Sequence, residues 1–188
     1  MKQLMILIIA AITVIGTQTT VAQDNTNLTK EQKKAEKKKL KEEAKAQETA
    51  EWEELKTLFV KKDIVFMGNV INGTTVDPKI NFIKIVGDNA IIQFANGFGG
   101  GANGIGGITL DGIVDTYKLS AAKPGKEISL TMTIRTRPGQ GVGGGPVNVM
   151  LSAFSYNSAR ISIGTGGFMD GEISSNEDAR IFEGNRPN

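Results

Sequence analysis

Apolar and polar residues alternate along much of the chain beyond residue 62. In residues 128–135, Ile, Leu, Met and Ile take every second position, with Ser, Thr and Arg between them. Since successive side chains of a strand point to opposite faces, this alternation predicts a strand that buries one face in an antiparallel sheet. Shorter runs predict further strands at residues 64–71, 80–86, 90–95, 113–119, 147–154 and 159–163.

Turn residues separate these strands, and the spacers 87–89 and 156–158 are short enough for tight hairpins. No helical period lies between the strands. The pattern therefore predicts a mainly β fold, namely an antiparallel β-sandwich, roll or small barrel of roughly seven to eight strands. These three architectures share the same alternation, so the pattern leaves the choice between them open.

Residues 24–62 are different, with 11 lysines, 9 acidic residues and no Gly or Pro. Apolar residues recur there at helical spacing from residue 49 onward, which predicts one charged N-terminal helix docked over residues 49–62. The docking residues are Trp52, Leu55, Leu58 and Phe59. Before them, lysines four residues apart place like charges on one side and weaken a helix. Although Thr29 and Gln32 fit a capping box, we expect residues 23–48 to be a frayed arm, helical or disordered.

The first residues have the layout of a secretory signal: Lys2, an apolar run over residues 4–15, and small residues before a cleavage point between Ala22 and Gln23. The alternative is a membrane anchor, but the apolar run is shorter than the roughly 20 residues that a span needs. The predicted organisation is a signal peptide (1–22), an arm (23–48) and a helix plus β domain (49–188). The expected location is the periplasm or the extracellular space, with no transmembrane segment after cleavage.

Composition narrows the chemistry. The 188 residues include no Cys and no His. A lipoprotein anchor, a disulfide, a thiol nucleophile, a Ser-His-Asp triad and a Cys/His zinc site are therefore excluded. With 22 basic and 20 acidic residues the net charge is +2, which argues against a nucleic-acid partner. We predict no cofactor, no metal site and no catalytic residue.

Glycines gather in residues 96–107, which contain a G-x-G-x-x-G motif at Gly99, Gly101 and Gly104. A dinucleotide site needs that motif between a strand and a helix. Here both flanks resemble strands, so the simplest interpretation is a mobile connection. A second glycine-rich segment covers residues 138–146, and in an up-and-down sheet both segments emerge at the same end. The candidate ligand- or partner-binding residues on them are Phe98, Asn103, Gln140 and Val142.

Charged side chains on the strands offer further candidates. Arg135 and Arg137 end an alternating strand and could hold an anionic group. Two pairs of carboxylates could perform glycoside hydrolysis without histidine if they stood at the right separation; they are Asp111 with Asp115 and Asp170 with Glu172. The alternative for each is a solvated face. The lysine-rich arm likewise could rest on anionic lipid or cell-wall polymer, or act as a solvated spacer.

The order of elements resembles a family of secreted Bacteroidetes proteins, domain-of-unknown-function family 4251. The residues that carry the resemblance are a helix end running into a strand (58–66), a hairpin (81–90) and the strands at 112–119 and 126–135. It covers about residues 49–173, and the segment 138–146 departs from it by being longer and richer in glycine. The resemblance implies a secreted antiparallel β domain with a leading helix and implies no activity.

These observations favour a non-enzymatic, secreted or envelope-associated binding module that contacts a ligand or partner through its glycine-rich loops. The partner would be an envelope glycan, lipid or protein. Two alternatives remain at this point: a carboxylate-based glycan hydrolase, and a periplasmic assembly or chaperone factor that works by pairing of strand edges.

Overall fold

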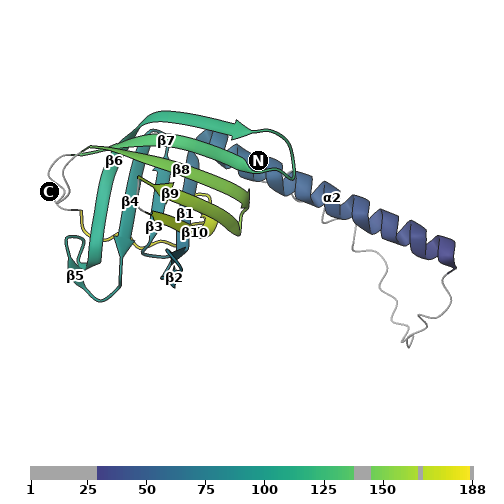
Figure 1. The fold of residues 1–188 in the computed structure, drawn as a ribbon, viewed down its shortest axis with the longest axis horizontal. Coiled ribbons are helices and arrows are strands. Elements are labelled where there is room, and N and C mark those ends of the chain that lie inside the picture. Colours follow the sequence, from purple (N-terminus) through teal and green to yellow (C-terminus); the bar gives the residue numbers. More distant parts are fainter. Residues whose placement is uncertain (1–28, 138–144, 165–166, 187–188) are drawn as a thin grey trace. The chain divides into compact units, whose positions relative to one another are not determined.

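The structure is a computed structural model, and it describes residues 29–137, 145–164 and 167–186 (Figure 1). One helix and ten strands follow one another: α2 (Lys30–Lys61), β1 (Asp63–Ile71), β2 (Thr74–Thr75), β3 (Phe82–Val86), β4 (Asn89–Ala95), β5 (Gly100–Gly101), β6 (Ile105–Ala121), β7 (Ile128–Thr136), β8 (Pro146–Ser155), β9 (Ser158–Ile163) and β10 (Gly167–Ser174). The chain forms two compact units, residues 1–42 and 43–188, and α2 belongs to both. In the part that the structure describes, no helix combines the length and apolarity that a membrane span requires.

Eight strands close into an antiparallel barrel in the order β1, β3, β4, β6, β7, β8, β9, β10. The last strand pairs with the first, with Phe66 opposite Ile173 and Met67 opposite Glu172. The short strands β2 and β5 add to β1 and β6 at their ends. The predicted antiparallel, mainly β fold is confirmed, and closure between β1 and β10 decides for a barrel.

Strand alternation explains the core. Along β7 every second side chain is buried inside the barrel, from Ile128 to Ile134. Both predicted hairpins form, since Val86 pairs with Asn89 and Ser155 pairs with Ser158. Strand β6 begins at Ile105, earlier than predicted, because the end of the glycine-rich segment pairs with β4.

The second half of α2 closes one end of the barrel. Trp52, Leu55 and Phe59 are buried in the same core as the inward-facing strand residues, which confirms the predicted docking face. The Trp52 indole donates a hydrogen bond to the Lys126 carbonyl at 2.7 Å, and the Tyr117 hydroxyl donates to the Phe59 carbonyl at 2.7 Å. We call this the helix end of the barrel.

The helix itself begins much earlier than predicted, at Lys30. Residues 30–48 of the expected arm are therefore helical, which is one of the two forms expected for it, and they are continuous with the docked part of the helix. The predicted capping box forms: the backbone N–H of Gln32 donates to Thr29 Oγ1, and the backbone N–H of Thr29 donates to Gln32 Oε1. The cap and the many Lys, Glu, Ala and Gln residues favour the helix more than the lysine repulsion opposes it. Residues 23–28 lie outside the described residues.

Candidate functional site

The two ends of the barrel differ. Because neighbouring strands are antiparallel, β1, β4, β7 and β9 all end at the side opposite α2, where β3, β6, β8 and β10 begin. We call this the loop end. The first glycine-rich segment lies between the end of β4 and the start of β6, and the second lies between the end of β7 and the start of β8. These strand ends are all at the loop end, as the up-and-down arrangement predicts. Residues 138–144 themselves lie outside the described residues.

The first glycine-rich segment has a defined hydrogen-bonded structure. Asn103 is only 1% exposed. Its Oδ1 accepts hydrogen bonds from the N–H groups of Ile105 and Gly107, at 3.1 and 2.9 Å. A Cβ at Gly107 would lie 1.8 Å from the Phe94 carbonyl oxygen, so the close pairing of β4 and β6 requires glycine there. The segment leads into strand β6, so the G-x-G-x-x-G motif does not precede a helix.

The structure separates the predicted binding residues. Phe98 is 92% exposed at the tip of the segment, whereas Asn103 is buried beneath it. Arg135 lies on the outer wall, where its Nε donates to Asp115 Oδ2 at 2.9 Å. Arg137 is exposed just beyond β7, and its backbone N–H donates to the Asp111 carbonyl at 3.1 Å. The other two candidates, Gln140 and Val142, lie outside the described residues.

An apolar hollow of about 360 Å³ opens at the loop end. Its described lining comes from the ends of β1, β4 and β9 and the start of β10: Ile71, Phe94, Ile163, Gly167, Phe168 and Met169. Ile71, Phe94 and Ile163 are partly buried and pack on the barrel core, so the hollow is the mouth of the barrel interior. This hollow was not predicted from the sequence. The available signal was an apolar residue at or near the last position of three strands that end on the same side.

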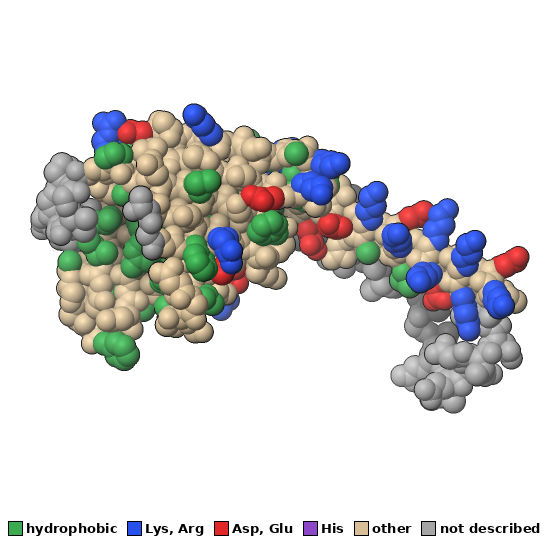
Figure 2. Space-filling view, in the orientation of Figure 1, with side chains coloured by type: hydrophobic (Ala, Val, Ile, Leu, Met, Phe, Trp, Pro, Cys, Tyr) green, Lys and Arg blue, Asp and Glu red, His purple; other side chains and the backbone are tan. Residues whose placement is uncertain are grey.

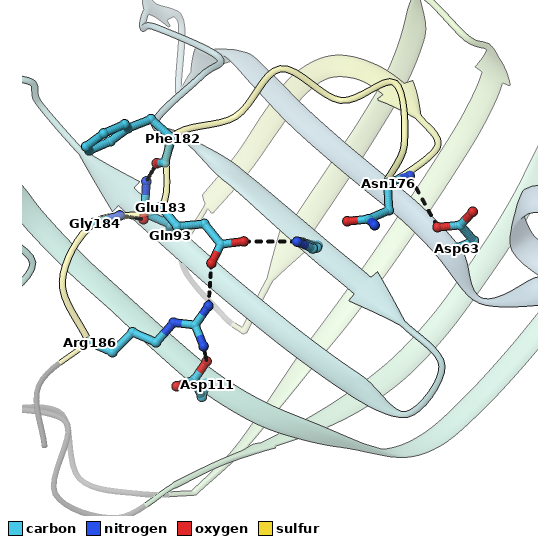
Figure 3. A network of polar contacts seen from close by, with 9 residues as sticks. Asp63, Gln93, Asp111, Asn176, Phe182, Glu183, Gly184 and Arg186 are labelled. Carbon is cyan, nitrogen blue, oxygen red and sulfur yellow. Dashed lines mark hydrogen bonds and ion pairs between the residues drawn. The ribbon is translucent and has the colours of Figure 1, made fainter.

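A second feature that the sequence analysis missed is the C-terminal strap (residues 175–186), which crosses the outside of the barrel (Figure 3). Its Ala179 and Ile181 pack on Val65, Met67 and Phe82. These three side chains face outward from β1 and β3, and the strap keeps them at most 8% exposed. The strap therefore builds a second small core on the outer wall.

Gln93 of β4 fixes the strap to the wall (Figure 3). This side chain is 0% exposed, and its amide makes four hydrogen bonds. Nε2 donates to the carbonyls of Ile80 and Phe182, at 3.1 and 2.8 Å. Oε1 accepts from the Gly184 N–H and the Thr109 hydroxyl, both at 2.8 Å. A neutral amide has two donors and two acceptor positions, so Gln93 is fully satisfied.

Ion pairs hold the end of the strap. Glu183 accepts from Lys84 at 3.0 Å and also pairs with Arg186, which in turn lies 3.3 Å from Asp111. Burial alone would raise the pKa of Glu183, but the hydrogen bonds from Lys84 and Arg186 outweigh it and hold the pKa below its ordinary value. The Asn185 N–H donates to the Asn103 carbonyl at 2.8 Å. The strap thus reaches the glycine-rich segment.

Three of the four candidate carboxylates are paired with arginines. Asp111 and Asp115 pair with Arg186 and Arg135, and Asp170 pairs with Arg160. That hydrogen bond from Arg160 lowers the pKa of Asp170, whereas a general acid needs a raised pKa. Glu172 lies in a separate groove of about 400 Å³ beside Lys79 and Arg180. The hollows lined by Asp111, Asp170 and Glu172 each contain one of the four, and within the described residues no group of three or more acidic residues is placed to hold a metal ion.

Comparison with known proteins gives a likeness of fold. No family model and none of the curated proteins matches the chain. The structure is similar to the crystal structure of a DUF4251 family protein from Bacteroides eggerthii, with a TM-score of 0.52 and 22% sequence identity. The match covers 73% of this chain and 96% of the other. The chain therefore has the fold of a DUF4251 family protein, in agreement with the resemblance found in its sequence.

Proposed function

We propose that the protein is an exported, non-enzymatic module that binds an apolar ligand, or an apolar group of a larger partner, at the loop end of its barrel. The observation that carries this proposal is the hollow lined by Ile71, Phe94 and Ile163. Its volume of about 360 Å³ falls at the lower end of the usual range for ligand sites. Its described lining consists of apolar side chains and one glycine, so burial of apolar surface would provide the affinity.

The contrast between the barrel ends supports this placement. At the helix end, Trp52, Leu55 and Phe59 are buried in the core, and the hollow beside Trp52 and Leu55 holds only about 50 Å³. At the loop end, Ile71, Phe94, Ile163 and Met169 belong to or pack on the core and also line the hollow. The interior itself is packed, so the site would take a ring or a short chain at the mouth and not a ligand that threads the barrel.

The other parts of the proposal rest on the sequence. Export is supported by the signal-peptide layout of residues 1–22, with a charged start, an apolar run and small residues before the cleavage point. These residues lie outside the described residues. The hydrolase alternative gains no support from these carboxylates, because Asp111, Asp115 and Asp170 are paired with arginines. The chaperone alternative gains none from a barrel in which β1 and β10 occupy each other's edges.

Titration with the neutral dye N-phenyl-1-naphthylamine tests the site, because its fluorescence increases in apolar surroundings. Phe94→Gln puts a polar amide into the lining and should weaken dye binding at least ten-fold. Phe154→Gln is the matched control, since Phe154 is 58% exposed and faces outward from β8. Equal affinities of the wild type and both variants, or no dye binding by the wild type, would contradict the proposal.

A further inference from the structure

The first part of α2 carries a strong excess of positive charge. Residues 30–42 contain seven lysines and three glutamates, a net charge of +4, and every one of these residues is exposed. Figure 2 shows lysine side chains spaced along the helix. The structure forms this segment as continuous α-helix, so the direction in which each side chain points follows from helical geometry.

The lysines gather on one side. At about 100° per residue, six of the seven fall within an arc of about 140°; these are Lys30, Lys33, Lys34, Lys37, Lys38 and Lys41. We call this arc the lysine stripe. The three glutamates and Lys39 lie outside it. A solvated spacer needs no such separation of signs, because mixed charges keep a helix equally soluble and stabilise it through pairing four residues apart.

Within the described residues, one ion pair neutralises charge of the lysine stripe, and it is weak. Among the described ion pairs, the one that involves the stripe joins Lys38 to Glu42 at 3.9 Å, with both side chains at least 70% exposed. Such a pair contributes little. Leu40, 60% exposed, is the only large apolar residue of this segment. The stripe therefore offers charge with no apolar face to insert or to pack on another helix.

We propose that the lysine stripe binds the anionic headgroup layer of a phospholipid bilayer. A rigid helix with its lysines on one side can bring all six towards a plane of negative charge at once, over about 17 Å of helix. A flexible polyanion can follow lysines around a helix, so it would gain little from a one-sided arrangement. Lysine also provides point charges without the paired donors with which arginine recognises a single phosphate. This inference goes beyond the apolar hollow and does not depend on it.

A variant with unchanged composition tests the inference. Glu36→Lys combined with Lys37→Glu keeps the net charge but replaces one positive charge of the stripe with a negative one. At about five-fold in affinity per charge near an anionic surface, the double variant should bind about 25-fold more weakly. The measurement is co-sedimentation of the chain from Gln23 with vesicles of phosphatidylcholine containing phosphatidylglycerol. Circular dichroism checks that both proteins have equal helix content.

The inference predicts binding by the wild type that is lost in high salt and is absent with pure phosphatidylcholine vesicles. Equal binding of the wild type and the double variant would overturn it, because the arrangement of the lysines would then be irrelevant. Failure of the wild type to bind anionic vesicles, or binding to pure phosphatidylcholine, would overturn it as well. Tighter binding to dextran sulfate than to vesicles at equal charge would also overturn it, in favour of a soluble polyanion.

Discussion

Replacement of Gln93 tests whether the strap is an integral part of the fold. Gln93→Leu keeps the approximate size of the side chain but removes all four hydrogen bonds of the amide. Three backbone groups then lose a hydrogen-bond partner: the carbonyls of Ile80 and Phe182 and the N–H of Gly184. Water cannot replace the lost partner directly, because Gln93 is 0% exposed. Thr109 keeps one partner, because its hydroxyl still accepts from Asn103 Nδ2.

The size of the effect follows from these groups. A buried polar group that loses its partner costs about 1–3 kcal/mol, and three such groups are left. The added leucine surface returns about 1–2 kcal/mol of hydrophobic stabilisation. We therefore expect a net loss between about 1 and 8 kcal/mol unless the strap detaches and lets water reach these groups. The free energy of unfolding of a whole domain is about 5–15 kcal/mol, so such a loss would be a large part of it. Detachment of the strap, which lets water reach the three groups, is therefore the expected response.

Two measurements separate local from global effects. Urea unfolding followed by circular dichroism reports the free energy of unfolding of the barrel. Hydrogen exchange of the Phe182, Gly184 and Asn185 amides reports the strap, because these groups donate to Lys79, Gln93 and Asn103. In Gln93→Leu these amides should exchange at least 100-fold faster.

The control is Gln47→Leu, because Gln47 is exposed on α2 and bonds only to Glu51 among the described contacts. It should change stability by less than about 0.5 kcal/mol. If Gln93→Leu matches this control in both unfolding and strap exchange, the buried amide does not hold the strap, and the reasoning is refuted.

Two further predictions concern the helix plug and the ion pairs of the strap. Phe59→Ala should destabilise the barrel by about 3–5 kcal/mol in urea unfolding, because Phe59 is 0% exposed, whereas Val60→Ala, at a 63% exposed position, should cost less than about 0.5 kcal/mol. Equal effects would show that α2 does not close the barrel. The lowered pKa of Glu183 means that its contribution is complete above the ordinary value of about 4.5 and is lost as the pH falls through the lower, folded-state pKa. Protection of the strap amides should therefore fall as the pH is lowered through the folded-state pKa of Glu183, which lies below its ordinary value. Glu183→Gln should show the low protection at all pH values; an unchanged pH profile in that variant would contradict this assignment.

Local patterns predicted the elements whose stability is local. The alternation in β7 and the apolar spacing of Trp52, Leu55 and Phe59 depend on neighbours in sequence, and both predictions are confirmed. The sequence left residues 23–48 open between helix and disorder, because lysine repulsion opposes a helix there while helix propensity and the cap at Thr29 favour one. Strand alternation, helix propensity, lysine repulsion and helix capping all depend on residues close together in the sequence.

Features that depend on distant residues could not be predicted in the same way. Closure of the barrel requires Phe66 to meet Ile173, and no pattern in either strand indicates that register. The strap has no periodicity, because it is an irregular segment whose backbone bonds to side chains such as Gln93. The mouth of the barrel is likewise a product of closure, since Ile71 and Ile163 line one hollow only when the first and last strands are joined.

Asn103 shows how these distant features combine at the loop end. Asn103 Nδ2 donates to the Thr109 hydroxyl, which donates to Gln93 Oε1, which accepts from the Gly184 N–H; the next strap residue, Asn185, donates back to the Asn103 carbonyl. This ring of hydrogen bonds joins the glycine-rich segment, two barrel strands and the strap, and its three side chains are at most 1% exposed. A buried network of this kind specifies one arrangement only when every member is satisfied. The described buried side chains include no unsatisfied polar atom. The glycine-rich segment at the loop end is therefore held from outside the barrel, by residues that no local pattern connects.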